Sequence, residues 1–186
     1  MVHSSLNLTL KSINAIVILD SEGKRLLSKY YSSEYPTAKD QKAFEKTLFE
    51  KTKKSSSASA IGDHIIMIDN QIVVYKFNID IFIYIIGSLE ENELILASIL
   101  NTYYEALCML FREQSPEKRS ILENLDLAIL ALDETIDDGI ILESDSSQVA
   151  GRVTKKNEGE SIPLAEQTIA QALQAARDQL TKSLRQ

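Results

Sequence analysis

The stretch QIVVYKFNIDIFIYIIGSLEENELILASILNTYYEALCMLFR, residues 71–112, predicts two apolar strands that lead into the longest helix of the chain. Residues 79–86 are β-branched or aromatic at nearly every position and are too few to span a bilayer, which is typical of a strand buried on both faces. Ser88 and Glu91 then form a capping-box pattern that predicts a helix start. We expect this helix to continue to Ser115, so that its roughly 25 residues reach about 37 Å.

Upstream of this stretch, the sequence predicts strands at 13–19, 25–31 and 64–68 and one helix; the strand at 71–77 begins the stretch itself. Residues 13–19 are apolar on both alternations and form an interior strand, whereas residues 25–31 mix charged and apolar side chains, as expected near a sheet edge. Thr37 is the predicted N-cap of a helix with a narrow apolar stripe. Strands at 64–68 and 71–77 follow, joined by a two-residue turn of a type that tolerates positive φ.

Downstream, Ser115 and Pro116 start a third predicted helix, with Pro at its first position, that ends at Gly139. Its apolar face consists of residues at helical spacing, Ile121, Leu122, Leu125, Ile129, Leu132 and Ile136. Because the interior strands are apolar on both faces, both faces must be covered. We expect the first helix on one face and the second and third helices on the other.

These patterns predict an α+β three-layer domain, with a five-stranded antiparallel sheet between helices and an added C-terminal amphipathic helix. We assign the domain to residues 1–153. Residues 154–162 form a polar linker. Residues 163–186 form a helical tail, which is marginal in water by itself and is expected to rest on a partner.

The net charge of −7 is unevenly placed, because residues 113–145 alone sum to −8. This argues against nucleic acid as a main ligand and against contact of the acidic face with an anionic bilayer. A basic protein surface is a better match. The single cysteine, the absence of a signal-peptide core and the absence of an 18-residue apolar run predict a cytosolic protein that meets membranes only through a partner.

The residues give no candidate for catalysis, metal binding or a cofactor. His3 and His64 have no Ser or Cys motif beside them, and Cys108 lies in an apolar helix body, which is typical of a structural thiol. The glycines fit no phosphate-binding motif. The acidic group at 133–138 fails the calcium-loop pattern because Ile136 would have to be a ligand.

Apolar side chains surround most of the second helix, although a surface helix needs only one stripe. Burial inside the domain and contact with another protein both account for this excess. The candidate partner-binding residues are Leu96, Leu100, Tyr103, Tyr104, Leu107 and Phe111 on this helix, with Leu173 and Leu180 on the tail.

Four segments resemble the zeta-subunit family of coatomer: AIVILDSEGKRLLSKYY, QKAFEKTLFEKT, VVYKFNIDIFIYIIGSLEENELILASILN and SPEKRSILENLDLAILALDETIDDGIILESDSSQVAGRV. The resemblance covers residues 13–153, and the element order is similar to the longin-type fold of adaptor small chains. VVYK followed by ENEL is shared with the sigma chains of clathrin adaptors, whereas EKRSILEN and DDGIILESD favour zeta.

This resemblance implies a non-catalytic small subunit of a vesicle coat without a cofactor, cytoplasmic and peripheral on Golgi membranes and coated vesicles. It implies pairing with the coatomer gamma large chain and with other coatomer subunits in Golgi-to-ER retrograde and intra-Golgi transport. An Arf-family GTPase is then met indirectly, and the membrane only through the coat. The roles of residues 1–12 and 51–63 stay open.

Two other classes of function stay open. One is a longin-type regulatory domain of membrane-fusion or clathrin-adaptor machinery. A membrane-fusion protein would need a coiled-coil heptad segment, and residues 163–186 are too short to form one. A small enzyme would need a polar catalytic cluster, which the sequence does not display.

The tail generates the first prediction. The double substitution Leu173→Asp with Leu180→Asp should weaken coat assembly, because each buried leucine at a contact contributes about 1.5–3 kcal/mol. Thermal melting of the free protein should not change. A large drop in melting temperature would instead show that the tail packs on its own domain.

Overall fold

The central sheet has the strand order β2-β1-β5-β4-β3, and all neighbouring strands are antiparallel. The computed structural model describes residues 12–53 and 63–159. The strands are β1 (Ala15–Asp20), β2 (Arg25–Tyr30), β3 (His64–Ile68), β4 (Gln71–Asn78) and β5 (Ile81–Ser88), with a separate two-stranded hairpin of β6 (Ile136–Asp137) and β7 (Ile140–Ile141).

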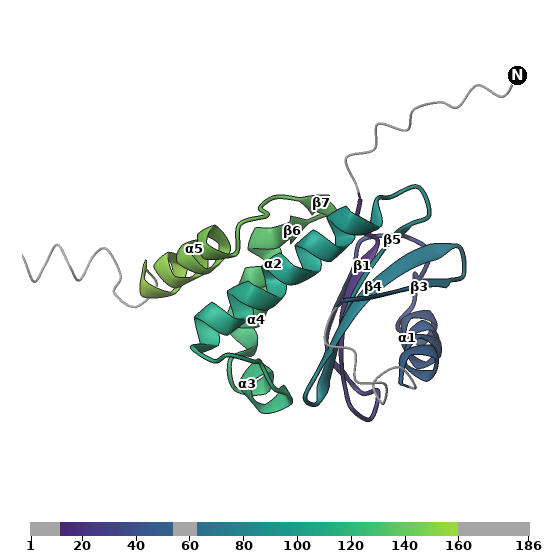
Figure 1. The fold of residues 1–186 in the computed structure, drawn as a ribbon, viewed down its shortest axis with the longest axis horizontal. Coiled ribbons are helices and arrows are strands. Elements are labelled where there is room, and N and C mark those ends of the chain that lie inside the picture. Colours follow the sequence, from purple (N-terminus) through teal and green to yellow (C-terminus); the bar gives the residue numbers. More distant parts are fainter. Residues whose placement is uncertain (1–11, 54–62, 160–186) are drawn as a thin grey trace, which may run out of the picture.

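Helices cover both faces of this sheet, as Figure 1 shows. They are α1 (Ala38–Thr52), α2 (Glu93–Phe111), α3 (Lys118–Glu123), α4 (Leu125–Thr135) and α5 (Ser146–Gly159). Helix α1 lies on one face, whereas α2, which also contacts β4 and β5, packs with α4 and α5 on the other. The predicted α+β fold with three layers and a five-stranded antiparallel sheet is therefore confirmed.

The middle strand β5 is buried on both faces. Its residues alternate between two separate apolar cores: Ile81, Ile83 and Ile85 pack with α2, whereas Phe82, Tyr84 and Ile86 pack on the α1 side. Neighbouring β1 alternates in the same way. Since burial of each such side chain is worth about 1.5–3 kcal/mol, neither face of the sheet could be left in water.

Several local predictions are confirmed. Strand β2, with its mixed side chains, is an edge of the sheet. Thr37 is the N-cap of α1, and its Oγ1 accepts a hydrogen bond from the Asp40 backbone N–H at 3.2 Å. Asp69 and Asn70 both have positive φ, 46° and 65°, as a two-residue hairpin turn between β3 and β4 requires.

The predicted start of the central strand was wrong. Ile79 has a φ of 50°, is 57% exposed and lies in the turn between β4 and β5. The strands instead close with Asn78 paired to Ile81. A β-branched residue at positive φ is unfavourable, so the apolar pattern alone gave no reason to place a turn there.

Both ends of α2 differ from the prediction. The N-cap is Asn92, whose Oδ1 accepts a hydrogen bond from the Leu94 N–H at 2.8 Å, while Ser88 Oγ accepts from the Glu90 N–H in the preceding turn. The helix has 19 residues rather than roughly 25. It ends because Arg112 adopts the left-handed conformation, with its N–H directed at carbonyl groups of the last turn.

The predicted third helix is two helices and a hairpin. Asn124 has a φ of −128° and separates α3 from α4, and its side chain donates to the Ser120 carbonyl at 2.9 Å. Pro116 precedes α3 and is not its first residue. Because this break turns the chain, Leu122 and Ile129 of the predicted apolar face are exposed.

Helix α5 extends through Gly159, so residues 154–159 of the predicted linker are helical. The domain boundary at 153 stays a prediction. The tail, residues 163–186 with Leu173 and Leu180, lies outside the described residues.

Among the described residues, α2 is the one helix long and apolar enough to cross a membrane by length and composition. Its apolar residues have another explanation here, because Leu96, Leu100 and Leu107 are fully buried in the core of this domain. Helix α2 is therefore the core helix of the larger helical layer.

Asp20, at the end of β1, is buried and ties α3 to the sheet. Its Oδ2 accepts a hydrogen bond from Lys118 Nζ at 2.8 Å, and its Oδ1 accepts from the backbone N–H groups of Lys24 and Glu22. Burial by itself raises the pKa of the Asp20 carboxyl, but these hydrogen bonds outweigh it and hold the pKa below its usual value. The Lys118 N–H also donates to Asp80 Oδ1 at 2.9 Å, so two turns position the start of α3.

Gly139, in the β6–β7 turn, generates the second prediction. Its φ is 79°, its carbonyl accepts hydrogen bonds from Ser12 and Ile13, and an added Cβ would lie 2.5 Å from the Ile13 oxygen. We expect Gly139→Ala to lower the free energy of unfolding by about 1–3 kcal/mol in urea titrations of the full chain. Gly151→Ala is the matched control, because an added Cβ there meets open space on α5. It should raise stability by about 0.4–1 kcal/mol, and equal effects of the two changes would contradict the argument.

Asp20 generates the third prediction. Since its pKa is lower in the folded state, its contribution to stability is present above the unfolded-state pKa of about 3.9 and is lost as pH falls through the folded pKa. We expect Asp20→Asn to cost about 1–3 kcal/mol at pH 7 and progressively less below about pH 4, measured by urea unfolding. Asp126→Asn, at an exposed position of α4, is the control. A cost that did not depend on pH would show that the charge of Asp20 is unimportant.

Candidate partner surface

Most of the partner-binding residues predicted on α2 lie in the core of this domain. Leu96, Leu100, Tyr103 and Leu107 are fully buried, and Tyr103 Oη donates to the Ala128 carbonyl of α4 at 3.1 Å. The sheet, α4 and α5 all contact α2. These four side chains therefore offer no surface to a partner in this conformation, and burial inside the domain accounts for them.

Tyr104 and Phe111 are only partly buried, and so stay candidates for contact. The Tyr104 ring lies under Lys76, whose Nζ is 4.6 Å from the ring centroid. Its hydroxyl accepts a hydrogen bond from Asn78 Nδ2 at 3.0 Å. These two interactions tie α2 to the end of β4.

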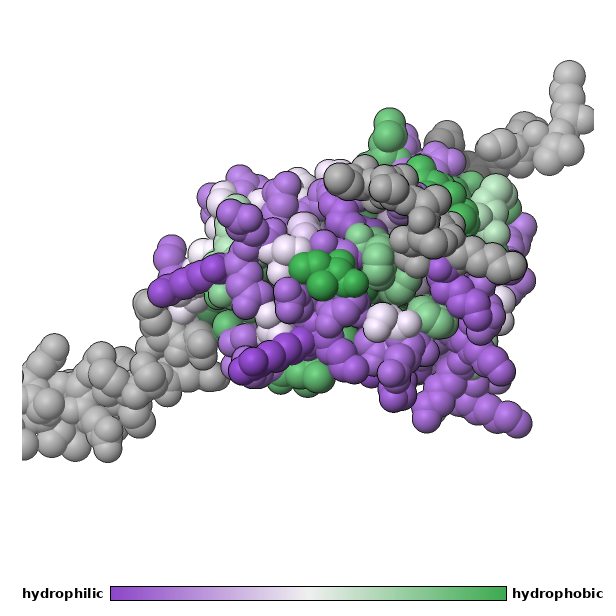
Figure 2. Space-filling model, turned by 60° about the horizontal axis from the view of Figure 1, so that its bottom comes forward, coloured by the Kyte–Doolittle hydropathy of each residue, from purple (hydrophilic) through white to green (hydrophobic). Residues whose placement is uncertain are grey.

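Exposed apolar side chains lie elsewhere than the sequence analysis placed them. The larger ones on β3 and near the start of α2 are Ile65, Met67, Leu89, Leu94 and Ile95. Sequence reasoning missed them because every residue of β3 except His64 is apolar, so the pattern does not tell which face is covered. The view in Figure 2 has a mainly hydrophilic surface, on which hydrophobic side chains form small separate groups.

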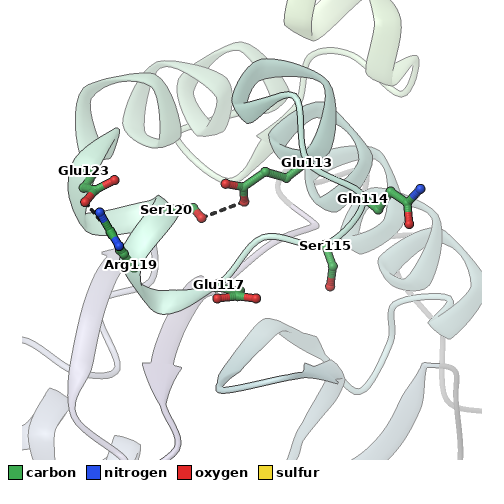
Figure 3. Close-up of a pocket in the computed structure, with 7 residues that line it drawn as sticks. All are labelled: Glu113, Gln114, Ser115, Glu117, Arg119, Ser120 and Glu123. Carbon is green, nitrogen blue, oxygen red and sulfur yellow. Dashed lines mark hydrogen bonds and ion pairs between the residues drawn. The ribbon is translucent and has the colours of Figure 1, made fainter.

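A shallow depression of about 460 Å³ lies between the end of α2 and α3, as Figure 3 shows. Glu113, Glu117 and Glu123 make its lining acidic. Ser120 Oγ donates to Glu113 at 2.6 Å, and Arg119 Nε donates to Glu123 at 2.7 Å. Most of its polar groups thus satisfy one another, and within residues 12–53 and 63–159 no group of three or more His, Cys, Asp or Glu could hold a metal ion.

The residues considered for nucleophilic chemistry have structural surroundings. Cys108 is half-buried, its thiol donates to the Gln114 carbonyl at 3.6 Å, and burial raises the pKa of the thiol. A raised pKa leaves less thiolate at neutral pH, which disfavours reactivity. His64 stacks on Tyr75, with ring centroids 5.1 Å apart. The arrangement fits a packed scaffold better than a reaction centre.

Comparison with known proteins gives consistent matches over the described domain. The model of the family described as clathrin adaptor complex small chain matches residues 12–160. Coatomer subunit zeta-1 of Homo sapiens is 46% identical over 176 residues, covering 95% of this chain and 94% of that protein. Coatomer subunit zeta-1 of Arabidopsis thaliana is 46% identical over 172 residues, covering 92% of this chain and 96% of that protein.

A similar fold occurs in an assembly described as a homology model of the full-length AP-3 complex in a stretched open conformation. One of its chains matches with a TM-score of 0.60 over 86% of this chain and 98% of its own length. At 18% sequence identity, this likeness concerns the fold alone.

Proposed function

This chain belongs to the clathrin adaptor complex small-chain family and, within it, to the coatomer zeta subunits, and we propose that it is a non-catalytic small subunit of the coatomer vesicle coat. The observation that carries the proposal is the 46% identity to coatomer zeta-1 across 95% of the chain. Identity at this level over nearly full length on both sides supports a shared role and not only a shared fold.

The proposed partner is the coatomer gamma large chain, with which this subunit pairs in an adaptor-like core alongside the other coatomer subunits. The proposed setting is the cytoplasm and the surface of Golgi membranes and coated vesicles, in Golgi-to-ER retrograde and intra-Golgi transport. An Arf-family GTPase acts on this chain indirectly, through the large chains, and the membrane is met only through the coat. The net charge of −7 supports this, because it disfavours direct contact with anionic lipid.

The non-catalytic part of the proposal is supported by the geometry of the polar groups. The depression near α3 is lined by side chains largely paired with one another, and the Cys108 thiol has a raised pKa. A reaction centre would instead hold groups whose protonation is tuned for proton transfer or attack. A scaffold needs only a stable shape and a surface for its partner.

The fourth prediction tests the pairing. Purified full-length protein should bind the gamma trunk of the same organism, and saturating trunk at 100 times Kd should raise its free energy of unfolding by about 2.7 kcal/mol. The measurement is urea unfolding with and without the trunk. The large-chain trunk of a clathrin adaptor is the matched control and should give no shift. A monomeric protein that is equally stable in both conditions would refute the pairing, and a shift with the clathrin-adaptor trunk alone would favour the sigma-like alternative.

A further inference from the structure

The exposed edge of the sheet at β3 carries apolar side chains on the same face as α2. Ile65 and Met67 are 50% and 67% exposed. They pair across the strands with Val74 and Ile72, which belong to the core under α2. Residues directly opposite each other in adjacent strands project to the same face of a sheet. Ile65 and Met67 therefore continue the apolar surface of that core beyond the cover that the helices provide.

The start of α2 borders this uncovered surface. Asn101 Nδ2 donates to Asp63 Oδ2 at 2.6 Å, just before β3, and so marks the side of α2 that faces this edge. Leu94 lies two helical turns earlier on the same side and is 76% exposed. Ser88 pairs with Gln71 next to the end of β3, so the start of α2 and the end of β3 lie at the same end of the sheet. We call the group Ile65, Met67, Leu89 and Leu94 the β3–α2 patch.

The two edge strands of the sheet differ in charge: β2 carries charged side chains, whereas β3 is almost entirely apolar. On β2, Arg25 pairs with Glu45 and Lys29 with Asp133, each at 2.6 Å. Such charges protect an edge strand from unwanted association. Strand β3 has the sequence HIIMI, with no Lys, Arg, Asp, Glu or Pro. An apolar edge that no other described element covers is a liability in a free monomer and is expected where another protein packs on it.

The charges around the patch indicate which kind of protein surface would bind to it. From residue 64 to residue 111 the only Lys or Arg is Lys76, which is paired with Asp63 and Asn101. The β3–β4 turn carries Asp69, the β5–α2 turn carries Glu90 and Glu91, and α2 begins with Glu93, so the charged residues here are all acidic. A twofold contact between two copies would bring these same acids together, which is unfavourable. An apolar surface flanked by Lys or Arg would complement them.

We propose that the β3–α2 patch is the docking surface for the large coat chain, which covers it with apolar side chains flanked by Lys or Arg. The proposal rests on the proposed function and adds to it the face by which this subunit is held. It also gives the apolar excess of α2 a second use. The inward side of the helix completes the core, and Leu94 at its start belongs to the interface.

The test measures binding of the purified gamma trunk to the full-length protein by calorimetry. Met67→Glu with Leu94→Glu should raise Kd at least about 30-fold, because two buried apolar side chains are replaced by charges next to existing acids. The matched control is Leu122→Glu with Ile129→Glu, which changes two other exposed apolar side chains, on α3 and α4. The control should bind within about twofold of wild type.

A second variant tests the acidic rim without touching the patch. Glu90→Lys with Glu93→Lys should weaken binding about tenfold and reduce its salt dependence, since attraction between exposed charges is screened by salt. Hydrogen exchange of the wild type should also show stronger protection of residues 64–68 when the trunk is bound, a readout that stands if the patch variant fails to fold.

The outcomes separate this inference from the proposed function. Trunk binding that survives in the folded patch variant, or is lost in the control pair instead, overturns the docking surface but leaves the pairing intact. A wild type that binds no trunk at all overturns the pairing and the docking surface together. A wild-type dimer that the patch variant converts to a monomer would assign the patch to a second copy of this chain and would also overturn the proposal.

Discussion

Burial of β5 on both faces is the constraint on which the rest of this structure depends. An isoleucine set on one side and an aromatic-rich set on the other require two separate cores, and each core requires its own helical layer. Within the described residues, α1 is the helix that packs on the aromatic-rich side. The other side needs α2 with α4 and α5 around it, which is why α2 carries apolar residues over most of its circumference.

A few directed polar contacts decide how the second half of the chain attaches to the sheet. Asp20 and Asp80 hold the start of α3 through Lys118, and the Gly139 carbonyl accepts hydrogen bonds from the segment that enters β1. The Lys118–Asp20 contact joins residues 98 positions apart in the chain, and the Lys118–Asp80 contact joins residues 38 positions apart. They make sheet and helical layer one body, so that a partner on one edge would meet a preformed surface with little ordering cost.

The side chains that do not belong to either core indicate what the surface of the domain can do. The polar groups near α3 are largely paired among themselves, and the thiol of Cys108 is half-buried with a raised pKa. Among the described residues, exposed apolar side chains lie on β3 and at the start of α2, with acidic residues in the turns beside them. An apolar surface of this kind, bordered by charged residues, is typical of a protein–protein contact.

The sequence by itself determined the fold class, the strands with their two-sided burial, and the Thr37 cap, because alternation and cap chemistry are local properties of the chain. It also determined the family, through segments spread over most of the domain. Only the tertiary structure showed that Ile79 lies in a turn and that Asn124 separates two helices. It also showed that Leu96 and Leu100 are buried in the core whereas Leu94 is exposed. An apolar residue looks the same in the sequence whether its neighbour is its own domain or another protein, and only the packing of distant elements settles which one it meets.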